Sequence, residues 1–226
     1  MLPLRDNVPT RSRPLVTYAL ILANVLVWVL YQLPDLQGSV DELAYHPCEL
    51  ENSCVQIGQD WPLTAVTSMF MHGDWLHLLG NMLFLWIFGN NVEDVMGHVR
   101  YLLFYLLAGL AATGLQTAIT LASSSEATAE IPNLGASGAI SGVLGAYFLI
   151  LPRARILTVI VFVLREIPAW FFLGIYFALQ LYDANFQLRH PPEGGGVAVF
   201  AHVGGFLFGL LTVYLFRKRR PLRPAY

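Results

Sequence analysis

An apolar run that ends near Leu151 opens with the stretch Gly135-Ala136-Ser137-Gly138-Ala139-Ile140-Ser141-Gly142. A serine held at the start of a helix is a candidate nucleophile, because backbone N–H groups and the helix dipole favour negative charge there. Gly138 and Gly142 also have the G-x-x-x-G spacing with which membrane helices approach one another closely. The stretch alone favours the packing interpretation, and the rest of the chain decides between the two.

Composition places the chain in a membrane. Of its 226 residues, 56% are hydrophobic and 12% are charged, whereas soluble domains carry about 25% charged residues. The net charge of −2 and the absence of a basic patch interleaved with aromatics give no indication of nucleic-acid binding. Arginines precede the first long apolar run, and no small-residue cleavage site follows it, so we expect a first transmembrane helix rather than a signal peptide.

Six apolar segments are long enough, or nearly so, to cross a bilayer core of about 30 Å. The second, fourth and fifth are short, which is typical of helices that begin or end inside the membrane against protein or a water-filled cavity. A further apolar stretch, Ile156–Leu164, is too short to span, and we expect it along the inner interface. The sequence therefore predicts an all-α membrane protein whose six helices run over Leu15–Leu33, Trp75–Gly89, Tyr101–Leu121, Leu134–Leu151, Ala169–Leu181 and Val197–Phe216.

The basic residues predict the orientation of this bundle. With six spans, 12 of the 13 Lys and Arg residues fall on one side and only Arg189 falls on the other. Positive charge marks the cytoplasmic side, so both termini are expected there, with residues 1–14 as an N-terminal tail and 217–226 as a basic C-terminal tail. Cys48 and Cys54 fall on the opposite side, where a disulfide can form, although two free thiols would look the same in sequence.

Polar side chains inside the spans gather at one depth. His202 lies about 7–8 Å below the outer end of the last segment, and Ser137 lies about 21 Å from the inner end of the fourth. His77 and Asn81 share one face near the outer end of the second, because they are four residues apart. Ionisable groups in the bilayer are costly and indicate a functional site. Three other polar residues are expected to form only interhelical hydrogen bonds, namely Asn24, Gln116 and Ser141.

The chemistry of this set is that of a serine hydrolase without a third carboxylate. Ser137 needs a neutral imidazole, either His202 or His77, to take its proton. Asn81 can donate to the oxyanion of a tetrahedral intermediate together with the Ser137 N–H. No H-E-x-x-H, buried aspartate pair or phosphate-binding glycine loop occurs, so neither a metal nor a cofactor is expected.

Three separated motifs resemble the rhomboid family of intramembrane serine proteases: Gly135-Ala136-Ser137-Gly138, His77-Leu78-Leu79-Gly80-Asn81 and Ala201-His202-Val203-Gly204-Gly205-Phe206-Leu207-Phe208-Gly209. The resemblance extends to His72-Gly73-Asp74-Trp75-Leu76 and Glu93-Asp94-Val95-Met96-Gly97, and covers most of the chain from Leu15 to Phe216. It implies a single rhomboid-like membrane domain over 1–226 with the six-helix core of the simplest members.

The resemblance also implies roles for individual residues. Ser137 matches the nucleophile and His202 its base, while Asn81 and His77 match the positions around the oxyanion. Gly205 and Gly209 match a small-residue seam that packs the last helix against the Gly138 and Gly142 side of the fourth, and His72 matches a structural position. The substrates implied are single-pass transmembrane proteins, which enter from the lipid bilayer and are cut near their outer end. The implied location is a bacterial inner membrane, with the active site opening on the non-cytoplasmic side.

Two departures from the family pattern leave questions for the structure. Many members have a bulky aromatic at the position of Ser141, and Phe206 or Trp75 are the candidates to replace it. The first loop reads Asp60-Trp61-Pro62-Leu63-Thr64 without the arginine of many members. The sequence allows two other functions. One is a non-catalytic binder of client membrane proteins, which the retained serine and histidine disfavour; the other is a proton-relaying transporter, which would need polar residues through the full bilayer depth.

Overall fold

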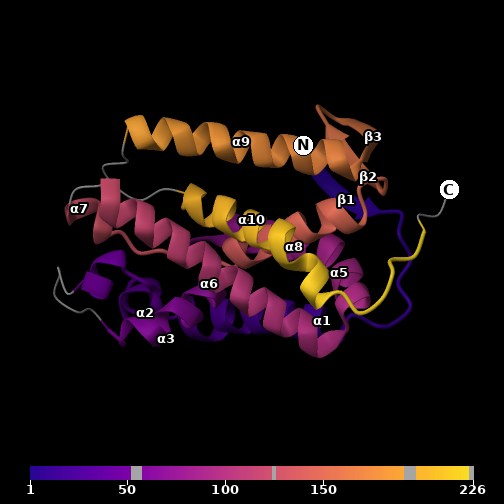
Figure 1. Cartoon of the computed structure of the whole chain (residues 1–226). Coiled ribbons are helices and arrows are strands. Elements are labelled where there is room, and N and C mark those ends of the chain that lie inside the picture. Colours follow the sequence, from indigo (N-terminus) through magenta and orange to yellow (C-terminus); the bar gives the residue numbers. More distant parts are fainter. Residues whose placement is uncertain (52–57, 124–125, 191–196, 224–226) are drawn as a thin grey trace.

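Helices occupy each of the six predicted apolar segments in the computed structural model, which describes residues 1–51, 58–123, 126–190 and 197–223 (Figure 1). The first and second are α-helices that continue as π-helical turns, and the third and fifth are longer than predicted. By length and composition, Leu15–Gln32, His98–Ala122 and Val199–Phe216 could cross a membrane, and Ser137–Ile150 is a shorter apolar helix. The six are α1 (Leu15–Leu26) with η1 (Val27–Gln32), α4 (Trp75–Phe84) with η4 (Leu85–Gly89), α6 (His98–Ser123), α8 (Ser137–Ile150), α9 (Ala169–Arg189) and α10 (Val199–Phe216).

Helices α8, α10 and α6 form the most closely packed part of the core. A Cβ added at Gly205 of α10 would overlap the carbonyl oxygen of Gly138 in α8, and one at Gly209 would overlap that of Gly142. Backbone therefore meets backbone along this contact, as small residues allow between membrane helices. α6 closes the third side with alanines, since a Cβ at Gly138 would lie 2.7 Å from the Cβ of Ala112.

Short helices and turns connect the long ones. The short elements are α2 (Leu36–Leu43), η2 (Pro47–Glu51), α3 (Trp61–Thr67), η3 (Ser68–Phe70), α5 (Asn90–Met96) and α7 (Glu126–Ala129). Asp35 caps α2 by accepting a hydrogen bond from the Gly38 N–H at 3.0 Å, and Asp74 caps α4 by accepting from the His77 N–H at 2.8 Å, as is usual for aspartate at a helix start.

The first loop is attached to the segment before α8 by backbone hydrogen bonds. Tyr45 and Asn133 form an antiparallel bridge, and the Gly135 N–H donates to the Ser68 carbonyl at 2.8 Å. These hydrogen bonds attach the loop, which lacks the arginine of the family pattern. Cys48 is buried in this loop, but Cys54 lies outside the described residues, so the disulfide stays a prediction.

A three-stranded antiparallel sheet shows that the expected all-α class is incomplete. Its order is β1-β2-β3, with β1 (Leu2–Asp6), β2 (Arg155–Ile160) and β3 (Val163–Pro168). The stretch predicted to lie along the interface is the hairpin of β2 and β3, which turns at Val161 and Phe162 with φ values of 45° and 69°. β-Branched residues, enriched in strands, make up much of this stretch. Figure 1 shows the sheet at the end of the molecule where α9 begins.

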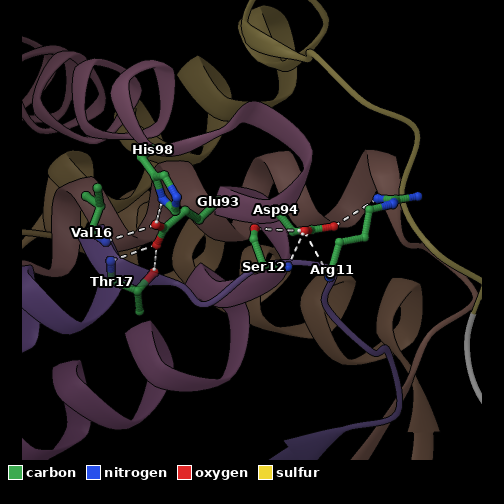
Figure 2. Close-up of polar contacts among 7 residues, drawn as sticks. All are labelled: Arg11, Ser12, Val16, Thr17, Glu93, Asp94 and His98. Carbon is green, nitrogen blue, oxygen red and sulfur yellow. Dashed lines mark hydrogen bonds and ion pairs between the residues drawn. The ribbon is translucent and has the colours of Figure 1, made fainter.

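Two buried carboxylates of α5 bind the beginning of the chain: Glu93 binds the first turn of α1, and Asp94 binds the segment expected as an N-terminal tail (Figure 2). Glu93 accepts hydrogen bonds from the Val16 N–H at 2.9 Å, the Thr17 N–H at 2.8 Å and the Thr17 hydroxyl at 2.7 Å. These backbone groups belong to the first turn of α1, whose own N-cap position, Pro14, offers no side-chain cap. Glu93 therefore caps α1 from 76 residues away.

Asp94 and Asp6 fasten the chain before α1. Asp94 accepts from the Arg11 backbone N–H at 3.0 Å and pairs with its guanidinium at 2.9 Å. Asp6 accepts from the Asn91 amide at 2.6 Å and from the Tyr147 hydroxyl at 2.5 Å. Partial burial raises the pKa of Asp6 from 3.8 to about 6, more than its hydrogen bond from Tyr147 lowers it. The residues before α1 are thus part of the folded domain.

Candidate active site

Ser137 and His202 meet where α8 and α10 are closest. Ser137 is the first residue of α8, and its Oγ lies 2.8 Å from the Nε2 atom of His202. Gly135, two residues earlier, has a φ of 122°, a backbone conformation that residues other than glycine rarely adopt. Ser137 therefore lies in the first turn of α8, where backbone N–H groups have no partner within the helix. The pair has the geometry that a base needs to take a hydroxyl proton.

The other ring nitrogen of His202 contacts a residue that the sequence analysis did not single out. His202 Nδ1 lies 3.1 Å from the Oε1 atom of Gln180 in α9. An amide oxygen only accepts hydrogen bonds, so this contact places the ring proton on Nδ1 and leaves Nε2 free to accept from Ser137. The available signal was a polar amide within the fifth apolar segment, which ends at Leu181.

His77 borders the same space as Ser137. A Cβ built at Gly135 would lie 2.8 Å from His77 Nε2 and 3.6 Å from Ser137 Oγ, so only glycine fits between the two side chains. The Gly73 N–H donates to His77 Nδ1 at 3.4 Å. With Nδ1 accepting, a neutral His77 carries its proton on Nε2, the nitrogen beside the candidate site.

Asn81 lies one turn deeper in α4 and contacts a second histidine. Its Nδ2 donates to His72 Nε2 at 3.0 Å, and the ring of His72 packs edge-on against that of His77 with centroids 5.0 Å apart. Gln32 holds the His72 backbone by bonding to both its N–H and its carbonyl, at 2.8 and 2.9 Å. The structure thus connects Asn81 to His77 through His72, and its role as an oxyanion donor stays a prediction.

Ser141 lies one turn below Ser137 and contacts α9 as well. Its Oγ is 2.8 Å from the hydroxyl of Tyr176, so this serine forms an interhelical hydrogen bond. Phe206 stacks on Phe177 of α9 with ring centroids 4.4 Å apart. Trp75, the other residue considered as a replacement for the missing aromatic, packs instead against Trp28 of η1.

The two remaining span amides behave differently from each other. Gln116 of α6 accepts from the Ala201 N–H in the first turn of α10 at 3.2 Å, an interhelical hydrogen bond of the predicted kind. Asn24 donates to the Leu20 carbonyl of its own helix at 2.7 Å, so the expectation of an interhelical bond for its amide nitrogen was wrong. An amide side chain reaches the carbonyl four residues earlier without a partner helix.

A small cavity of about 30 Å³, partly open to solvent, lies on the α6 side of Ser137. Gln116, Thr113 and Asn133 give its lining polar groups, and Met69 and Ala201 give it apolar ones. A cavity of this size and mixed lining has room for water beside the serine. Within the described part of the chain, no group of three His, Cys, Asp or Glu residues is placed to hold a metal ion.

The comparisons with known proteins all match this chain to rhomboid proteins. The Rhomboid domain family matches residues 59–219 of this chain. Rhomboid protein 1, mitochondrial, of Saccharomyces cerevisiae is 29% identical over 201 residues, covering 89% of this chain and 53% of the yeast protein. Rhomboid protease GluP of Bacillus subtilis is 34% identical over 135 residues, covering 60% and 24%. The human presenilin-associated rhomboid-like protein, mitochondrial, is 27% identical over 218 residues, covering 90% and 50%. This chain spans about half, or less, of the length of these relatives.

Proposed function

The chain belongs to the rhomboid family, and we propose that it is an intramembrane serine endopeptidase in which Ser137 is the nucleophile and His202 the general base. The observation that carries the proposal is the 2.8 Å contact between Ser137 Oγ and His202 Nε2. Relatives from bacteria and mitochondria that are named as rhomboid proteins, one of them a protease, support it.

The proposed reaction follows from the positions of these groups. His202 Nε2 takes the proton of the Ser137 hydroxyl as the oxygen attacks a peptide carbonyl, and later gives that proton to the leaving amine. The Ser137 N–H and the Nε2–H of His77 border the position where the oxyanion develops and stabilise it. Asn81 is the other proposed oxyanion donor, and its contact with His72 links it to the His77 ring. The reaction needs no metal or cofactor.

The same proposal gives the arrangement in the membrane. The six long helical segments cross the bilayer, both termini are cytoplasmic, and residues 1–226 form one membrane domain with its site open on the non-cytoplasmic side. Single-pass transmembrane proteins are the proposed substrates, reached through the lipid bilayer and cut near their outer end. A helical peptide bond must unwind before a serine attacks it, so residues that weaken the helix are expected at the cleavage site.

A serine-directed fluorophosphonate tests the proposal in detergent. The wild type should be labelled and Ser137→Ala should not, because the reagent needs an activated hydroxyl. Ser141→Ala is the matched control, since it removes a hydroxyl from the next turn of the same helix, and it should remain labelled. Labelling that persists in Ser137→Ala would refute the assignment.

Cleavage is then measured on a panel of transmembrane substrates, with the product termini sequenced. Wild type should cut within or near the transmembrane helix, and Ser137→Ala should not. A wild type that binds these proteins without labelling or cleavage would point instead to the non-catalytic binder.

A further inference from the structure

Resting on the proposed function, the geometry points to Gln180 as the positioning residue for His202: its amide oxygen fixes the imidazole tautomer and orientation that Ser137 requires. The established parts of a serine protease site include a group that holds the base. Among the described residues, no hydrogen bond or ion pair joins His202 to a carboxylate, and Asp183, the acidic residue nearest to Gln180 in α9, is exposed. The contact on the far side of the ring is Gln180 Oε1, at 3.1 Å from Nδ1.

Donor and acceptor types decide the tautomer of His202. A neutral imidazole carries one proton, on either nitrogen. If the proton were on Nε2, the ring could not accept the serine proton, and Nδ1 would face the amide oxygen as one acceptor facing another. Gln180 therefore favours the reactive tautomer over the unreactive one, and it holds the ring plane in line with Ser137 Oγ, 2.8 Å away.

The contact comes from a helix with few other polar connections to the site. Gln180 and Tyr176 are four residues apart in α9 and so share one face. Tyr176 reaches Ser141 of α8 at 2.8 Å, while Gln180 reaches His202 of α10. Since both bonds depend on α9 lying against α8 and α10, Gln180 makes the state of His202 depend on the position of α9.

The two α9 contacts provide a variant and its matched control. Gln180→Met keeps the length and shape of the side chain but removes the oxygen that accepts from Nδ1–H. Tyr176→Phe removes the neighbouring α9 hydrogen bond and leaves His202 untouched. Gln180→Glu restores an oxygen at the same reach.

The first measurement is the rate of fluorophosphonate labelling, which requires the Ser137–His202 pair but no transmembrane substrate. Gln180→Met should lower this rate about three- to tenfold, the value of one ordinary hydrogen bond. Tyr176→Phe should stay within about twofold of wild type, and Gln180→Glu should recover most of the loss.

The second measurement separates positioning from a general structural effect. In substrate cleavage, Gln180→Met should lower kcat while KM stays within about twofold, because the contact does not touch the substrate. An ionised carboxylate at 180 would stabilise the protonated ring, so Gln180→Glu should become active at a higher pH than wild type. A general structural defect would not lower kcat while leaving KM unchanged, and it would not shift the activity of Gln180→Glu to higher pH.

Failure of the inference about Gln180 and failure of the proposed function would give different results. If the wild type is neither labelled nor active, the protease assignment fails. If the wild type is active and Gln180→Met labels and cleaves at the wild-type rate with the same pH profile, the inference about Gln180 is wrong. Equal losses in Gln180→Met and Tyr176→Phe would also overturn it, because the effect would then belong to the packing of α9.

Discussion

Replacing Glu93 with glutamine tests whether a distant carboxylate caps α1. The Glu93 side chain is 1% exposed and accepts from two backbone N–H groups and one hydroxyl of Val16 and Thr17. Glutamine keeps the shape but offers one acceptor oxygen, and it turns an amide N–H₂ group toward donors. Loss of two hydrogen bonds to a charged group, at roughly 1.5 kcal/mol each, and of the helix-dipole interaction, at about 0.5 kcal/mol, gives about 3.5 kcal/mol.

The free energy of unfolding is measured by equilibrium titration with SDS in dodecyl maltoside micelles. Glu166→Gln is the control, because its pair with Arg155 is 3.5 Å long and half-exposed, and such pairs contribute less than about 1 kcal/mol. Thr17→Val should cost about 1 kcal/mol in the wild type and much less in Glu93→Gln, since the two share a hydrogen bond. A Glu93→Gln change below about 1 kcal/mol, or strictly additive effects with Thr17→Val, would refute the capping argument.

Three further predictions concern other parts of the molecule. Raising the pH through about 6 should ionise Asp6, because its pKa in the folded protein is above the unfolded value of 3.8. The free energy of unfolding that protonated Asp6 contributes below pH ~4 is then lost, which amounts to about 1–2 kcal/mol after allowance for its partial exposure. Melting curves between pH 4 and 8 should show this loss, and Asp6→Asn should be flat over the same range. Gly205→Ala should lower fluorophosphonate labelling at least about tenfold and cost about 1–3 kcal/mol, because the added Cβ meets the backbone of α8. Gly114→Ala, where the added Cβ lies in open space, should leave labelling unchanged and should not lower stability; an equal loss in both variants would contradict this. His77→Phe should lower kcat about 10²-fold with stability nearly unchanged, as expected for loss of an oxyanion donor; a wild-type kcat would remove His77 from the site.

The helices of this protein were predictable because apolar length is a direct signal in a membrane chain. The residues at which the helices begin and end were harder to predict. α9 continues eight residues past the predicted end at Leu181, since Asp183 and Asn185 lower its hydropathy without breaking the helix. The hairpin at Ile156–Leu164 was missed as strands because a short apolar run does not distinguish strand from helix. Its partner β1 is also far away in sequence.

The candidate site, too, was predictable only in part. Depth along each helix follows from counting residues, so Ser137 and His202 could be matched from the sequence. Rotation about each helix does not follow from counting. Whether Asn81 faced Ser137 or His72 therefore needed the structure. Gln180 belongs to no motif, and its role depends on how α9 packs against α10, which no local pattern encodes.

The strand β1 has a consequence for how the protein is made. Its neighbours come much later in the chain: Tyr147, which bonds Asp6, is 141 residues further on, and Arg155, which bonds Asn7, is 148. At roughly 5–20 residues per second, the ribosome needs on the order of ten seconds to supply them. During that time the strand has an unpaired edge that is open to other chains. A tag or fusion placed before Leu2 would therefore act during synthesis, when it competes with pairing to β2, and its effect should be seen in the yield of folded protein.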